Sequence, residues 1–126
     1  MMTYAGAALR NAKNAYGEAQ ISTAPQKKLL IMLYDGAIMN LMIAEKAIVN
    51  GQFETAHLKL VKTQDILVEL MATLNFEFGG QIAQSLYKLY DFFYLTLVEA
   101  NVSKNVEKVV QVRGFLEALR NTWLEI

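Results

Sequence analysis

Residues 21–38 read ISTAPQKKLLIMLYDGAI, the start of a long helical pattern. Thr23 is a good N-cap residue, because its hydroxyl can accept a hydrogen bond from a free backbone N–H of the first turn. Pro25 is tolerated in that turn. Apolar residues then repeat every three or four positions, as on a helix packed on one face: Leu30, Leu33, Ala37, Leu41, Ala44 and Ile48. We predict a helix from near Thr23 to Asn50-Gly51, two residues that tolerate the left-handed conformation common at helix ends.

Three further helical patterns follow the first one. The second runs from about residue 53 to 78 and is broken by Gly79-Gly80. The third spans about residues 81–101, and Ser103 can cap a fourth that continues to the chain end. No alternation typical of a strand has a useful length. Because connections this short force neighbouring helices to run antiparallel, the sequence predicts an all-α fold, an antiparallel up-down four-helix bundle.

The N-terminal residues differ from these patterns in having only a thin apolar stripe. They are rich in alanine, which favours a short helix or arm of marginal stability. A chain of 126 residues suits a single domain that buries one core. We therefore expect one helical-bundle domain over residues 1–126, with an N-terminal arm over 1–20 and the bundle over 23–126.

The composition excludes several classes of function. Lys plus Arg and Asp plus Glu both number 12 and the basic residues are scattered, so we expect no nucleic-acid partner. The absence of cysteine excludes a disulfide framework and fits a reducing cytosol. No secretory signal pattern is seen, and the longest apolar run, Leu29–Ile43, is interrupted and too short to span a bilayer. We expect a cytoplasmic protein without membrane insertion.

Two places could carry chemistry. Glu54 and His57 have the Glu-x-x-His spacing of di-iron bundles, but such sites need that pair twice and the chain has one histidine. Asp35 interrupts the first helix, where acids such as Asp91 could converge on it in an active site, or where it could bond a tyrosine or cap a turn. No phosphate loop or nucleophile elbow occurs. We expect no enzyme, no cofactor and no metal; an all-α metal-binding or enzymatic bundle is the alternative.

The chain carries more apolar residues than a bundle core requires. Hydrophobic residues make up 54 %, against roughly 45–50 % in typical globular domains. A bundle helix needs only about three inward positions in seven. The surplus fits a thick core, a structural homodimeric bundle, cover from the N-terminal arm, or a groove for an amphipathic helix of another protein. The pattern alone does not choose among these interpretations.

Four blocks of sequence carry a more specific signal. The first spans residues 23–37 and contains Leu33-Tyr34-Asp35-Gly36. The others span residues 62–74, 79–92 and 97–123. In this order and spacing, the blocks resemble the FliS family of flagellar export chaperones, and the likeness covers about residues 16–126.

The chain keeps some details of the FliS pattern and departs from others. Tyr16 stands ten residues before Gln26, as the family's N-terminal tyrosine stands before its proline. Here the proline comes one residue earlier, at Pro25. Leu95-Thr96 stand where many members carry two arginines, so no electrostatic contact is implied there. Lys104-Asn105 replaces a common Asn-Asp turn.

The resemblance implies a cytosolic chaperone of flagellar type III export. Such a protein binds the disordered C-terminal segment of flagellin and prevents premature polymerisation before secretion, without hydrolysing a nucleotide. A segment that folds on binding loses conformational entropy, so it needs long apolar grooves around which to wrap.

The expected partner-binding residues come from the arm and from the bundle. We expect Tyr16 and Ile21 of the arm to cover part of an apolar groove and to be displaced by flagellin. A homodimer is a further association that the apolar surplus would allow. For the groove itself we predict side chains of the second and third helices: Leu67, Met71, Tyr87 and Tyr94.

Overall fold

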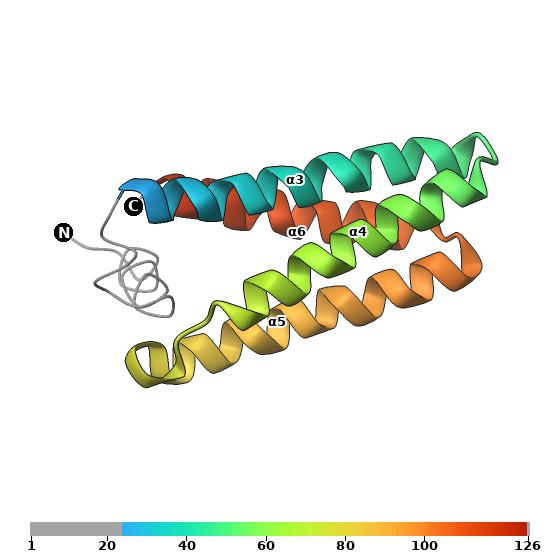
Figure 1. Cartoon of the computed structure of the whole chain (residues 1–126). Helices are drawn as coiled ribbons and strands as arrows, with labels where there is room; N and C mark the ends of the chain where they lie inside the picture. The colour runs from blue at the N-terminus through green and yellow to red at the C-terminus, as the bar shows by residue number, and fades with distance from the viewer. Residues whose placement is uncertain (1–23, 126) are drawn as a thin grey trace.

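The computed structural model describes residues 24–125, which form four α-helices joined by short turns (Figure 1). The helices are α3 (Ala24–Val49), α4 (Phe53–Ala72), α5 (Phe76–Ser103) and α6 (Val106–Leu124). No strand occurs over residues 24–125, so the predicted all-α bundle is confirmed. The arm predicted over residues 1–20 lies outside the described residues.

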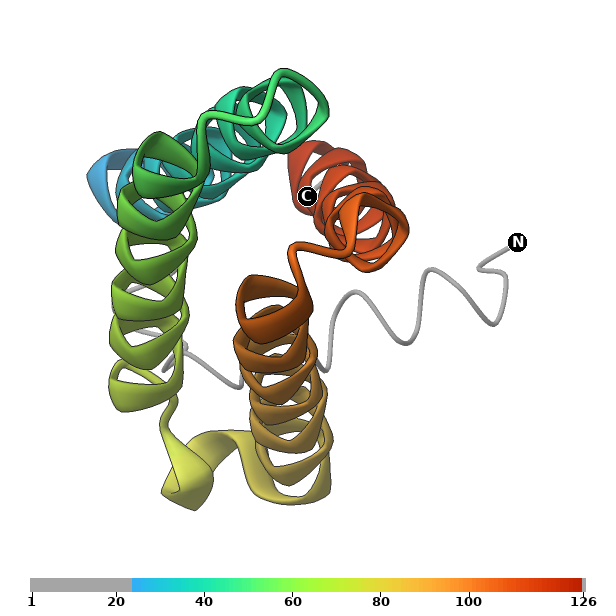
Figure 2. The same cartoon turned by 90° about the vertical axis from the view of Figure 1, so that its right-hand side faces the viewer.

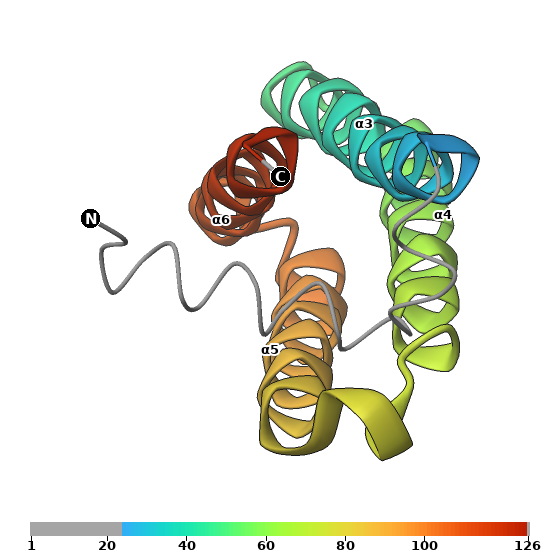
Figure 3. The ribbon, with the colours of Figure 1, turned by 90° about the vertical axis from the view of Figure 1, so that its left-hand side faces the viewer.

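The helices form a ring in which each one packs against two others. α3 packs against α4 and α6, and α5 closes the ring between α4 and α6. Successive helices run antiparallel, and the α4–α5 pair swings away from the α3–α6 pair toward the α4–α5 turn (Figures 1, 2 and 3). None of the helices described over residues 24–125 combines the length and apolar character that a membrane span needs.

The core takes one apolar stripe from each helix. The buried side chains of α3 repeat every three or four residues, as predicted. Leu33 and Ile48 are partly buried and pack at the edge of the core, and Tyr34 lies in its centre. Each fully buried large side chain contributes about 1.5–3 kcal/mol relative to an exposed one. The largest of these side chains are Tyr34, Tyr90, Phe93, Leu41, Leu60, Leu67, Leu70, Leu97 and Leu116.

A polar network lies inside this core. Tyr34 Oη lies 2.5 Å from Tyr90 Oη, and Trp123 Nε1 donates a hydrogen bond to Tyr34 Oη over 3.1 Å. Burial, and then the nearby Tyr90 hydroxyl, raises the pKa of Tyr34 well above its ordinary value. The network satisfies buried polar atoms and links α3, α5 and α6.

The end of α3 agrees with the sequence prediction. The helix ends at Val49, and Gly51 has φ of 72°, a left-handed conformation that suits glycine. The predicted N-cap, Thr23, lies outside the described residues.

The end of α4 does not agree, because this helix stops at Ala72 and not near residue 78. Thr73 closes the last turn: its backbone N–H bonds to the carbonyl of Glu69, and its Oγ1 donates to the carbonyl of Leu70 over 3.0 Å. A side chain that bonds its own backbone in this way competes with helix continuation.

The third helix was predicted to start at residue 81, and the structure adds one short helical turn before it, across a kink. Asn75 caps the helix, since its side-chain oxygen accepts a hydrogen bond from Phe78 N over 3.1 Å. Phe76–Gly79 are therefore the first turn of α5, and the chain kinks at Gly80, which has φ of 50° and ψ of −124°. The glycine break exists, but it lies inside α5.

Ser103 was predicted to cap the fourth helix, α6, and this prediction was wrong. Ser103 belongs to the last turn of α5, where its Oγ donates to the carbonyl of Glu99 over 3.0 Å. Lys104 then adopts a left-handed conformation, with φ of 51° and ψ of 45°. Asn105 caps α6, because its side-chain oxygen accepts a hydrogen bond from Lys108 N over 3.2 Å.

Candidate partner-binding site

Much of the apolar surplus lies on the outside of the bundle. Met39 is 64 % exposed, Leu58 60 % and Val102 84 %. A thick core therefore does not account for the surplus, and exposed apolar surface on this scale is typical of a binding face. Other exposed members are Leu29, Met32, Met42, Val49, Val68, Phe76, Phe78, Tyr87, Phe92, Leu95 and Phe115.

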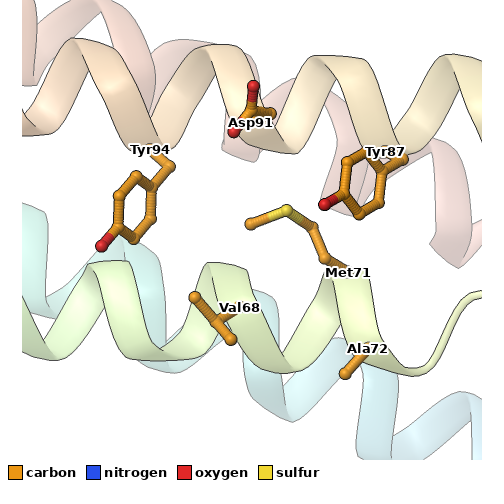
Figure 4. Close-up of a pocket in the computed structure, with 6 residues that line it drawn as sticks. All are labelled: Val68, Met71, Ala72, Tyr87, Asp91 and Tyr94. Carbon is orange, nitrogen blue, oxygen red and sulfur yellow. The ribbon is translucent and has the colours of Figure 1, made fainter.

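Two neighbouring helices frame an open groove, which we call the α4–α5 groove (Figure 4). Its volume is about 360 Å³. On α4 the lining positions lie three and four residues after Val68, and on α5 they are four and three residues apart, so each helix contributes one outer stripe. The lining residues are Val68, Met71 and Ala72 on α4, and Tyr87, Asp91 and Tyr94 on α5.

The core residues next to this lining hold it in place. Leu67 and Tyr90 are fully buried, and each directly precedes a lining residue, Val68 or Asp91. Because an α-helix turns by about 100° per residue, a residue that follows an inward one can face the space between the two helices. Packing of the core thus orients the groove.

The structure brings Met71, Tyr87 and Tyr94 together in the groove. Figure 4 shows Met71 extending between the two tyrosine rings. Leu67 lies instead beneath the groove, fully buried in the core. Tyr16 and Ile21 lie outside the described residues.

Val68, Ala72 and Asp91 also line the groove and were not among the predicted partner-binding residues. A signal for them exists, because Val68 is three residues before Met71 and Asp91 is four residues after Tyr87. This spacing becomes informative only once the outward stripe of each helix is known.

The Glu54–His57 pair lies near the start of α4. Nδ1 of His57 is 2.8 Å from Nδ2 of Asn101 on α5, a contact between neighbouring helices. Over residues 24–125, no group of three or more His, Cys, Asp or Glu side chains is placed to hold a metal ion. This contact joins two helices, which is a structural role for His57.

Asp35 forms an ion pair with Arg120, which links α3 to α6. The expectation that it bonds a tyrosine or caps a turn was wrong. A second ion pair at the same seam joins Arg113 Nε to Glu45 Oε2 over 2.5 Å. Hydrogen bonds to Glu45 raise the pKa of Arg113, which keeps the guanidinium charged. Asp35 and the groove residue Asp91 thus lie at different seams and do not form a common active site.

A second hollow lies at the α3–α6 seam. Its volume is about 590 Å³, and it carries charged residues beside the apolar ones. Its lining consists of Met42, Glu45, Lys46, Val49, Asn50, Val106, Val110 and Arg113.

Comparison with known proteins places this chain in a family. Residues 9–126 match the family model described as flagellar protein FliS. The chain is 32 % identical over 116 residues to the flagellar secretion chaperone FliS of Bacillus subtilis, covering 92 % of this chain and 86 % of the relative. It is 32 % identical over 115 residues to that of Campylobacter jejuni, with 91 % and 90 % covered, and 31 % identical over 110 residues to that of Salmonella typhimurium, with 86 % and 82 % covered. On these grounds the chain belongs to the FliS family of flagellar proteins.

Proposed function

We propose that this chain is a cytoplasmic chaperone of flagellar secretion whose client is the disordered C-terminal segment of flagellin. Its relatives are named flagellar secretion chaperones. The observation that carries the proposal is the α4–α5 groove, an apolar channel on the outside of a bundle whose own core is already filled.

The groove suits a segment that becomes helical on binding. An amphipathic helix can lay its apolar face between Met71 and the two tyrosine rings, with successive anchors three or four residues apart. Each apolar client side chain buried there contributes about 1.5–3 kcal/mol. Ordering each client residue costs about 1–2 kcal/mol of backbone entropy. Several anchors are therefore needed, which is a physical reason for apolar surface on more than one face.

The proposed activity is binding alone. A client held on the chaperone cannot use the same apolar surface to polymerise, so no covalent step is required. In this proposal Tyr16 and Ile21 of the arm cover part of the groove until flagellin displaces them. Deleting residues 1–17 should then raise peptide affinity and expose surface that binds a hydrophobic dye. If affinity and dye binding were both unchanged, the arm would have no such role.

The main test is calorimetric titration of the full chain with a peptide of the flagellin C-terminal segment. We expect saturable binding with a large negative heat-capacity change, which reports apolar burial. Met71→Glu should weaken binding strongly, because it places a charge in the groove. Gln111→Glu adds the same charge at an exposed polar position of α6, outside the groove, and should have little effect.

The outcomes separate the interpretations. No binding by the wild-type chain would contradict the chaperone proposal and favour a structural homodimeric bundle, which sedimentation would detect. Equal loss of affinity with Met71→Glu and Gln111→Glu, or loss with neither variant, would place the client elsewhere on the bundle.

A further inference from the structure

A carboxylate lies among the apolar side chains of the α4–α5 groove. Asp91 is the one charged residue of the lining and lies about one helical turn from Tyr87 and from Tyr94. Across the groove, α4 presents only Val68, Met71 and Ala72. Figure 4 shows Asp91 on α5 between the positions of Tyr94 and Tyr87, with its carboxyl group close to the α5 ribbon.

This carboxylate has no cationic partner in the described part of the chain. The ion pairs over residues 24–125 use other acids, namely Asp35, Glu45, Glu99 and Glu117. Lys88, one turn earlier on α5, forms no ion pair with Asp91. The carboxylate is therefore available to a molecule that enters the groove.

A client helix that covers the groove would take water away from this charge. Loss of hydration is costly for a carboxylate unless a positive or hydrogen-bonding group replaces the water. A client with only apolar residues over Asp91 would therefore bind less well than one that places a donor there. The neighbouring tyrosine faces add a preference for a guanidinium, which can bind a carboxylate with two hydrogen bonds and stack on an aromatic ring.

We propose that Asp91 sets the register of the client in the α4–α5 groove by pairing with a basic side chain of the client, and that arginine is the preferred one. This inference rests on the proposed function and specifies the client chemistry. The segment that binds carries one basic residue with apolar residues three or four positions before and after it. Those apolar residues cover Met71 and Tyr87 on one side and Val68 and Tyr94 on the other.

The test measures affinity by calorimetry for the full chain and two variants, Asp91→Asn and Asp91→Lys. The probe is a set of peptides of the flagellin C-terminal segment in which each Lys or Arg is replaced by Gln or Glu in turn. Glu107→Gln and Glu107→Lys serve as matched controls, because Glu107 is an exposed acid on α6 outside the groove. They reproduce the change of net charge.

We expect Asp91→Asn to weaken binding of the native peptide by about 5-fold to 30-fold, the range of a hydrogen bond to a charged group. Asp91→Lys should weaken it more, and the Glu107 variants should not. One of the Gln peptides should bind the wild-type chain about as weakly as the native peptide binds Asp91→Asn. The same Gln peptide should bind Asp91→Asn with little further loss of affinity. The peptide with Glu at the same position should regain affinity for Asp91→Lys.

Other results would overturn the inference without touching the proposed function. One such result is an unchanged affinity of Asp91→Asn for the native peptide while Met71→Glu abolishes binding. The other is that the loss of affinity from replacing each basic residue of the peptide simply adds to the loss from Asp91→Asn. If the wild-type chain bound none of the peptides, the proposed function itself would fail.

Discussion

Replacing Tyr34 by phenylalanine tests the polar network inside the core. The substitution removes one oxygen and leaves the ring in place. Tyr90 and Trp123, both buried, lose the hydrogen bonds that they form with the Tyr34 hydroxyl. The apolar packing of α3 against α5 and α6 is retained, so the change isolates the hydrogen bonds.

The magnitude follows from the two hydrogen bonds that are lost. A typical intramolecular hydrogen bond contributes about 0.5–1.5 kcal/mol net, so Tyr34→Phe should lower the free energy of unfolding by about 1–3 kcal/mol. The control is Tyr87→Phe, at a side chain that is 44 % exposed in the groove. Substitutions at such surface positions usually change stability by less than about 0.5 kcal/mol.

Urea unfolding followed by circular dichroism measures both variants. We expect Tyr34→Phe to move the urea midpoint to lower concentration with an unchanged slope, which indicates altered stability and not an altered unfolded state. A midpoint for Tyr34→Phe equal to that of the wild type, or an equal loss for Tyr87→Phe, would refute the reasoning.

Further predictions concern pH and single positions. The pKa of Tyr34 is raised in the folded chain, so the protonated hydroxyl contributes its full stabilisation below the unfolded pKa of about 10, and this contribution declines as the pH rises above that value. Above a pH of about 10, the urea midpoint should therefore fall less steeply with pH in Tyr34→Phe than in the wild type. Gly80→Ala should lower the free energy of unfolding by about 1–3 kcal/mol, because Gly80 has a left-handed backbone. Gly114→Ala lies inside α6 with open space around the added methyl group and should raise the free energy of unfolding by about 0.5–1 kcal/mol. Equal shifts in melting temperature for the two variants would contradict this. Asn105→Ala should cost about 1 kcal/mol as loss of the α6 cap, and Ser103→Ala clearly less, a difference that thermal unfolding can detect.

Periodicity predicted the helices well because each of them buries one stripe of apolar side chains. The helix ends were harder, since several neighbouring residues have side chains that can cap. Asn75 and Asn105 became caps because their backbones are extended there. Ser103 remained helical, and its hydroxyl bonds within its own helix. Which polar residue leaves the helix depends on how the two helices meet, and local sequence does not contain that information.

The groove was predicted in part for a related reason. Spacing along a helix identifies stripes but not the direction in which each stripe faces. Met71 and Tyr94 belong to outward stripes, whereas Leu67 turns into the core one residue before the outward Val68. Asp91 was considered only as a catalytic acid, because a charge inside a binding groove cannot be recognised before the groove is known.

The position of Trp123 gives the molecule a built-in optical reporter. It is the chain's one tryptophan, it is 2 % exposed, and its indole N–H points at the Tyr34 hydroxyl. Its emission should therefore be short in wavelength in the native protein and shift to the red when the helices separate. A ligand in the α4–α5 groove touches none of these atoms, so a peptide could saturate the protein with the spectrum unchanged. Intrinsic fluorescence would then follow the integrity of the bundle, and an added dye or a labelled peptide would be needed to follow occupancy.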